Sequence, residues 1–250
     1  MAPVSNWTGW YAGLNLGYGF NDPTVTTTPN DTIGAILVGI IPGGLPQISY
    51  GMDGIIGGAQ VGYNWQTATN WVVGLEADIQ GTSLKGSGVV QLPTFMAGPA
   101  AFLNASQEVK WYGTLRGRLG WLANDRLMVF GTGGLAYGGV KETSTLGYLV
   151  PLVNGAGAGG FFTQCTLTNN CYNGSSTRVQ VGYTLGAGLE YALWQNMTVK
   201  AEYMYVNLGS SNLTSVSNPS GVPGQQIATL NAHFSDLYFN VVRVGANWRF

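Results

Sequence analysis

Apolar and polar residues alternate along the end of the chain, from Ser235 to Phe250. One set of alternate positions is apolar and consists of Tyr238, Val242, Val244, Ala246, Trp248 and Phe250. The other set consists of Arg243, Gly245, Asn247 and Arg249. Successive side chains of a strand point to opposite faces, so this segment predicts a β-strand with one apolar and one polar face.

The same alternation recurs and predicts eight strands in all. They cover residues 8–20, 54–66, 71–82, 108–123, 127–141, 177–193, 197–209 and 235–250. Short connections (67–70, 124–126 and 194–196) alternate with long ones (21–53, 83–107, 142–176 and 210–234). An even strand number with short periplasmic turns and long outer loops is typical of bacterial transmembrane barrels. We therefore expect an all-β, eight-stranded antiparallel transmembrane β-barrel with periplasmic termini.

Composition supports a membrane barrel and excludes other classes. Only 8% of residues are charged, against roughly 25% in ordinary soluble domains. No run of about 18 apolar residues could form a spanning helix, which excludes a helical membrane protein. The net charge of −1 argues against a nucleic-acid partner. We expect one barrel domain, 8–250, after an N-terminal periplasmic segment, 1–7, and we expect that an export leader has been removed.

Tryptophans mark one rim of the predicted barrel. Amphipathic rings prefer the membrane interface, and most tryptophans of this chain lie beside a terminus or a short turn. The aromatic girdle predicted there consists of Trp10, Trp65, Trp71, Trp121, Trp194 and Trp248. The opposite rim is predicted from Tyr18, Phe20, Trp111, Tyr137, Tyr205 and Tyr238.

Charged residues of the predicted strands share the face opposite the large apolar residues. This lumen face is predicted to hold Glu76, Asp78, Glu108, Lys110, Arg116, Arg118, Arg178, Glu190, Lys200, Glu202, Arg243 and Arg249. Counting from the turns places Glu76 and Asp78 near Arg116 and Arg118. The same count places Glu190 opposite Lys200, and Glu202 level with Arg243. Phe130 does not fit, because it lies in the opposite phase to its apolar neighbours on the strand.

Two functions follow from this lumen. An eight-stranded barrel is just wide enough for its side chains to fill, and unpaired buried charges are costly, so we expect an ion-paired plug. The alternative is a narrow small-solute pore that repels cations slightly, because the predicted lumen has seven bases and five acids.

A third hypothesis concerns His233, Phe234 and Ser235. Outer-membrane lipid-A esterases, which are also eight-stranded barrels, resemble this arrangement in using a His-x-Ser pair, and Asp236 could orient the imidazole. However, such an esterase presents the pair to lipid, whereas His233 and Ser235 share the phase of lumen-facing Arg243. A polar residue at the loop rim is the simpler interpretation. We expect no enzyme activity, cofactor or metal.

The long loops contain two further features. Cys165 and Cys171 are the only cysteines, and an oxidising location favours a disulfide between them. The segments 33–45 and 148–162 are unusually apolar for loops that face water. We expect hairpins that extend the barrel strands, or alternatively an exposed patch that binds another copy, a lipid or a protein partner.

Three motifs resemble the small outer-membrane proteins of alphaproteobacteria, often called "porin family" or "outer-membrane immunogenic protein". They are NWTGWYAGLNLGYG at 6–19, GTGGLAYG at 131–138, and VGANWRF at 244–250. Trp248 and Phe250 also resemble the C-terminal assembly signal read by the barrel-assembly machinery. The resemblance implies an eight-stranded barrel in contact with outer-membrane lipid, with loops at the cell surface and a structural rather than catalytic role. Some relatives are tethered to peptidoglycan through their N-terminus.

Overall fold

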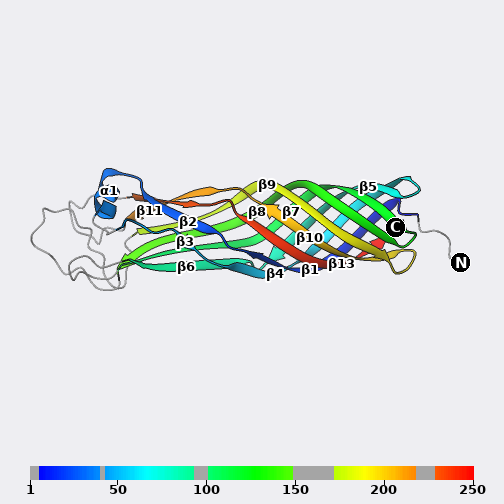
Figure 1. Ribbon diagram of the computed structural model, residues 1–250, viewed down its shortest axis with the longest axis horizontal. Coiled ribbons are helices and arrows are strands. Elements are labelled where there is room, and N and C mark those ends of the chain that lie inside the picture. Colours follow the sequence, from blue (N-terminus) through cyan, green and yellow to red (C-terminus); the bar gives the residue numbers. More distant parts are fainter. Residues whose placement is uncertain (1–5, 40–42, 93–100, 149–171, 218–228) are drawn as a thin grey trace, which may run out of the picture.

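The computed structural model describes residues 6–39, 43–92, 101–148, 172–217 and 229–250, and Figure 1 shows an elongated barrel. The elements are β1 Gly9–Asn21, β2 Thr24–Pro29, α1 Thr32–Gly39, β3 Ile48–Ser49, β4 Met52–Ala68, β5 Trp71–Thr82, β6 Lys85–Leu92, β7 Ala101–Asn124, β8 Leu127–Tyr148, β9 Tyr172–Ala192, β10 Met197–Asn207, β11 Ser211–Ser217, β12 Thr229–Phe234 and β13 Tyr238–Arg249. The chain is thus almost entirely β-structure within the described residues.

Eight antiparallel strands close into a ring. Following the hydrogen-bonded neighbours gives β1, β4, β5, β7, β8, β9, β10, β13 and again β1. Closure leaves no free sheet edge in this part of the molecule. The short turns, the start of β1 and the end of β13 lie at one end, here called the turn end, and the opposite end is called the loop end (Figure 1). The predicted strands all occur, with bounds shifted by at most seven residues.

An outer tier continues the barrel beyond the ring. β7, β8 and β9 are long, with 24, 22 and 21 residues, and extend past their shorter neighbours. In this tier β6 pairs with β7, β11 pairs with β9, and β12 and β2 continue the sheet. Residues that the sequence predicts to be loops therefore form five additional strands, β2, β3, β6, β11 and β12.

A β-bulge at Lys110 reverses the facing of β7. The register against β8 shifts between Val109 and Trp111, so one residue is left unpaired. Odd-numbered residues point inward on the loop-end side of the bulge, and even-numbered ones on the turn-end side. The prediction that Glu108 and Lys110 face the lumen is wrong for this reason. Glu108 instead lies on the outer face, in register with Lys85 and Lys141.

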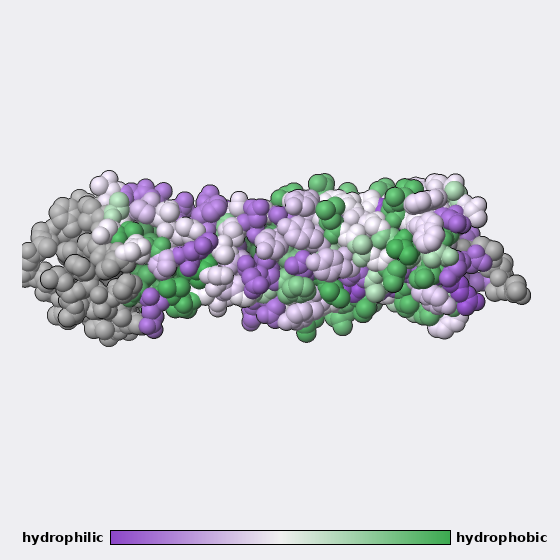
Figure 2. Space-filling model, viewed as in Figure 1, coloured by the Kyte–Doolittle hydropathy of each residue, from purple (hydrophilic) through white to green (hydrophobic). Residues whose placement is uncertain are grey.

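The exterior of the ring carries a belt of exposed aliphatic side chains. Leu14 is 70% exposed and Leu16 is 60% exposed, values that would be unfavourable in water. The six predicted girdle tryptophans are all exposed at its turn-end side. Figure 2 shows apolar surface gathered toward the turn end and a more polar surface along the middle of the molecule. The belt therefore has the distribution expected of a lipid-facing wall.

The interior is layered along the barrel axis, as the inward side chains of β7 show. From the turn end they run from Leu122 through Arg118 and Arg116 to Tyr112, and finally to Leu103. Three buried apolar clusters are defined by residues of several strands. The turn-end cluster is Trp7, Val72, Leu122, Met128, Phe130 and Ala192. The middle cluster includes Met52, Ile56, Tyr112, Met204, Phe239 and Val241, and the outer cluster includes Ile48, Leu103, Tyr172 and Phe234.

Within its described residues, the apolar segment 33–45 contains a helix and none of the expected hairpin strands. Helix α1 occupies most of it, and Asp31 caps the helix by accepting a hydrogen bond from the Gly34 amide at 2.6 Å. Val38 and Leu45 pack against the outer cluster. Binding of a partner through 33–45 and 148–162 stays a prediction. Most of the second segment lies outside the described residues, as do both cysteines of the predicted disulfide.

Candidate functional site

Eight charged side chains fill one level of the ring and are called the charged layer. They are Glu76 and Asp78 on β5, Arg116 and Arg118 on β7, Glu190 on β9, Lys200 and Glu202 on β10, and Arg243 on β13. None is more than 5% exposed. Each alternates with outward aliphatic residues on its strand, which directs it into the lumen. Four cations meet four anions, so the formal charge of the layer is zero.

Arg116 and Arg243 hold the centre of the charged layer. Arg116 donates to Glu202 at 2.5 Å, to Asp78 at 3.0 Å, and also to Glu76. Arg243 donates to Glu202 at 2.7 Å and to Asp78 at 3.1 Å. Asp78 and Glu202 are therefore each shared by two guanidinium groups. Such planar donors suit carboxylates, and the sharing makes the layer a network rather than a set of separate pairs.

Lys200 and Arg118 connect strands that are not neighbours. Lys200 lies directly opposite Glu190 in the register, where the sequence predicts an ion pair. Its Nζ instead lies 3.0 Å from Glu76 Oε2 and 3.5 Å from Glu202, whereas Glu190 pairs with Arg118. In a narrow barrel, long side chains reach across the lumen, so strand register alone does not determine charge partners.

Two aromatic residues that the sequence did not assign to the site belong to it. Phe130 is buried, and the Arg118 guanidinium lies 4.1 Å from its ring centroid. Phe130 departs from the apolar phase of its strand because it points inward, where its ring attracts the Arg118 cation. Tyr11 is also buried and donates from its hydroxyl to Glu76 at 2.7 Å. The sequence does contain a signal for Tyr11: on β1 it lies in the alternate phase to Leu14 and Leu16, which point outward, so it must point inward.

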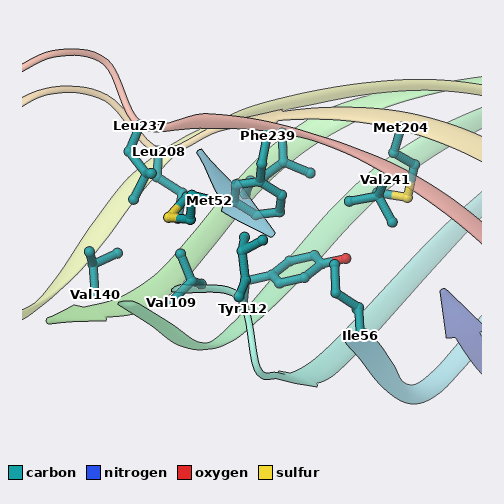
Figure 3. Close-up of a cluster of buried hydrophobic side chains, with 13 residues drawn as sticks. Met52, Ile56, Val109, Tyr112, Val140, Met204, Leu208, Leu237, Phe239 and Val241 are labelled. Carbon is teal, nitrogen blue, oxygen red and sulfur yellow. The ribbon is translucent and has the colours of Figure 1, made fainter. Parts of the chain in front are cut away.

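Apolar clusters cover the charged layer on both sides. The turn-end cluster includes Trp7, which is only 1% exposed and therefore does not belong to the exterior girdle. Figure 3 shows the middle cluster, in which Tyr112 and Phe239 meet edge to face with ring centroids 5.3 Å apart. Met204 of this cluster contacts Arg116, which joins the two layers. The lumen is therefore filled by apolar, charged and apolar side chains in succession.

The predicted excess of lumen bases is wrong. Glu108 and Lys110 leave the lumen because of the bulge on β7. Arg178 lies in the outer tier, where its side chain is 38% exposed. Arg249 lies at the turn end, with its guanidinium 5.1 Å from the Trp7 ring centroid. Only the balanced set of eight remains in the charged layer, which removes the argument for a cation-repelling channel.

A second buried polar site, around Glu142, lies between the middle and outer clusters. Glu142 Oε1 accepts hydrogen bonds from Ser211 at 2.5 Å and from Gln107 and Gln180 at 3.2 Å. Arg178 approaches the other carboxylate oxygen to 3.8 Å. Sequence reasoning missed Glu142 because it ended the strand at 141. Continuing the inward phase of β8 by two residues from Val140 would have found it.

The hypothesis of a catalytic His-x-Ser pair gains no support. The exposed His233 ring contacts Asn212 at 2.8 Å, while Ser235 Oγ accepts from the Thr24 amide at 3.2 Å. Within the described ranges, no hydrogen bond joins His233 to Ser235 or Asp236, so a base and nucleophile are not paired. The same ranges contain no group of three His, Cys, Asp or Glu residues that could hold a metal ion.

In the part of the chain that the structure describes, no helix is long and apolar enough to cross a membrane.

Comparison with known proteins gives a family match over residues 1–250 to the outer membrane protein beta-barrel domain. The 31 kDa outer-membrane immunogenic protein of Brucella melitensis is 37% identical, and the alignment covers 100% of this chain and 87% of the relative.

A more distant relative is the 22 kDa outer membrane protein of Rhizobium leguminosarum, which is 24% identical over 85% of this chain and 69% of its own length. Among solved structures, OprG from Pseudomonas aeruginosa aligns over 97% of this chain and 96% of its own, with 12% identity and a TM-score of 0.49. The full-length family match and the 37% identity agree with the closed ring and its apolar belt. The chain belongs to the outer membrane protein beta-barrel family.

Proposed function

We propose that this protein is a structural, surface-exposed barrel of the outer membrane whose lumen is closed to solutes. In this proposal the turn end faces the periplasm and the outer tier stands at the cell surface, as in outer-membrane barrels with short periplasmic turns and long outer loops. The ring of eight strands crosses the membrane. The outer tier then serves as the part of the protein available to other surface components.

The observation that carries the proposal is the balanced charged layer between two apolar clusters. A solute crossing the ring would have to separate ion pairs such as Arg116 with Asp78, at 3.0 Å. It would also have to displace buried rings such as Phe239, which is 0% exposed. Breaking a buried pair by removing one partner typically costs about 3–5 kcal/mol, and an unpaired charge in an apolar environment is costly. Both barriers favour a static plug.

Single-channel conductance in planar bilayers tests the proposal. We expect no conductance from the refolded wild-type protein. Arg116→Ala/Arg118→Ala should conduct, because it removes two large side chains and leaves an excess of carboxylates in the lumen. Arg178→Ala is the matched control, because it removes an arginine outside the charged layer and should stay silent. Steady conductance from the wild-type protein would contradict the plugged barrel and favour a small pore.

The orientation needs a separate experiment. In a chain with both native cysteines replaced by serine, Ser87→Cys would mark the outer tier and Asn124→Cys the turn end. Both positions are exposed. A membrane-impermeant maleimide added to intact cells should label only the cysteine at 87. Labelling of only the cysteine at 124 would mean that the barrel is inserted the other way.

A further inference from the structure

A groove of about 700 Å³ interrupts the exposed apolar belt of the ring. Residues of β1, β8, β9, β10 and β13 line it. Strand register places its lining in two rows across the sheet. The row nearer the turn end is Leu14, Ala246, Val199, Tyr191 and Leu127. The next row is Leu16, Val244, Ala201 and Leu189.

Small residues between large ones create this groove. The central strands contribute Ala246 and Val244 on β13, and Ala201 and Val199 on β10. The longer Leu14 on β1 and Leu189 on β9 form the walls. Leu14 is 70% exposed and Leu189 is 50% exposed, so both walls project outward. A trough with a floor of alanines and valines and with leucine walls offers more apolar contact to a slender chain than the surrounding convex surface does.

A cation stands at the turn-end rim of the groove. Arg126 is exposed and directly precedes Leu127, a lining residue. Its carbonyl accepts the Ala192 amide at 2.8 Å, which fixes the arginine backbone beside the end of β9. Exposed Trp248 lies two residues beyond Ala246 on the same side of the barrel. The site thus combines an apolar trough, an interfacial ring and a guanidinium group at one end.

We propose that the groove binds one anionic phospholipid, with an acyl chain in the trough and the headgroup phosphate on Arg126. A guanidinium donates two parallel hydrogen bonds to phosphate oxygens, and basic residues beside apolar spans are typical lipid-headgroup contacts. The identity of the lipid rests on the orientation proposed above, which places the turn end in the periplasmic leaflet.

A second copy of the chain fits the groove less well. A two-fold dimer brings the same patch of both copies together, so a concave groove would face another concave groove. That contact would enclose a void between the two groove floors, and a void forfeits packing contacts. A flexible acyl chain fills such a trough without this loss. Dimer formation is nevertheless one outcome that the experiment must detect.

Native mass spectrometry in detergent, with phosphatidylglycerol or phosphatidylcholine added separately, tests the proposal. Ala201→Leu/Ala246→Leu fills the trough from outside and leaves the charged layer untouched, since both alanines face outward. Ala77→Leu is the matched control on β5, across the ring from the groove. Arg126→Gln removes only the cation. Urea unfolding of each variant in vesicles verifies that it folds.

We expect wild type and Ala77→Leu to retain one phosphatidylglycerol. The trough-filled variant should bind phosphatidylglycerol at least about tenfold more weakly than wild type. In Arg126→Gln, the ratio of phosphatidylglycerol to phosphatidylcholine affinity should fall by about tenfold, as expected for the loss of a hydrogen bond to a charged group. Equal retention by the trough-filled variant overturns the proposal, as does an unchanged preference in Arg126→Gln. A wild-type dimer that only the trough-filled variant abolishes would make the groove a subunit interface. Conductance and cysteine labelling are measured independently, so failure of the plug or of the orientation is distinguishable from failure of lipid binding.

Discussion

The pair formed by Arg118 and Glu190 allows a quantitative test of the charged layer. We consider Arg118→Met, Glu190→Met and the double variant. Among the described residues, Glu190 is the one carboxylate that forms a salt bridge with Arg118. The Arg118 guanidinium also lies 4.1 Å from the Phe130 ring centroid and 3.5 Å from the Tyr11 hydroxyl. Glu190 also accepts hydrogen bonds from Thr198 and, at 3.1 Å, from Asn247. The pair is therefore more nearly self-contained than the central network around Arg116.

Each single variant leaves one buried charge without its main partner. Arg118 and Glu190 are 3% and 2% exposed, so water does not readily replace the lost partner. We expect each single change to lower the free energy of unfolding by about 3–5 kcal/mol. The double variant removes both charges, keeps the layer neutral and fills the space with apolar side chains of similar size. Replacement of a complete buried pair in this way is often nearly neutral, so we expect a change of at most about 1–2 kcal/mol.

Urea unfolding of the protein refolded into phospholipid vesicles, followed by tryptophan fluorescence, measures the three free-energy changes. Lys85→Met is the control, because it removes an exposed charge and should shift stability by no more than about 0.5 kcal/mol. The signature of the proposed pairing is a double variant that is more stable than either single variant. If the two single effects simply add in the double variant, the charges do not compensate each other and the reasoning is refuted.

Three other predictions concern different layers of the molecule. Phe239→Ala should lower the free energy of unfolding by about 3–5 kcal/mol in the same urea assay, because the ring is fully buried; a smaller effect of Phe239→Leu provides the comparison. Deletion of Lys110 should reverse the facing of residues 101–109 and make the outer tier susceptible to limited proteolysis. Lys110→Ala keeps the residue count and should not have this effect. Equal resistance of both variants to proteolysis would contradict the role of the bulge. Glu142→Leu should destabilise the outer tier by about 1–3 kcal/mol for each hydrogen-bond donor that it leaves unsatisfied. Glu142→Gln should destabilise the tier less, because its carbonyl oxygen can still accept hydrogen bonds. Hydrogen exchange of the outer-tier amides measures both effects.

Much of the ring and its lining could be predicted from local alternation. The phase of Glu76 and Arg116 against outward Leu75 and Leu115 depends only on the two-residue period of a strand. Charge partners could not be predicted equally well, because Lys200 reaches Glu76 across the lumen rather than Glu190 opposite it. The outer tier was also missed, because its additional strands are short: β11 has seven residues and β12 six, so the alternation in each covers only a few positions.

The sequence by itself determined the membrane-barrel class, the inward and outward faces of most strands, and the aromatic rim. These features are local, because alternation sets the face of each residue and interfacial rings sit where strands end. Only the tertiary structure decided the neutrality of the lumen and the layered plug. A single unpaired residue at Lys110 reverses the facing of a whole strand segment. Charged side chains from five strands converge in a lumen that is just wide enough for side chains to fill.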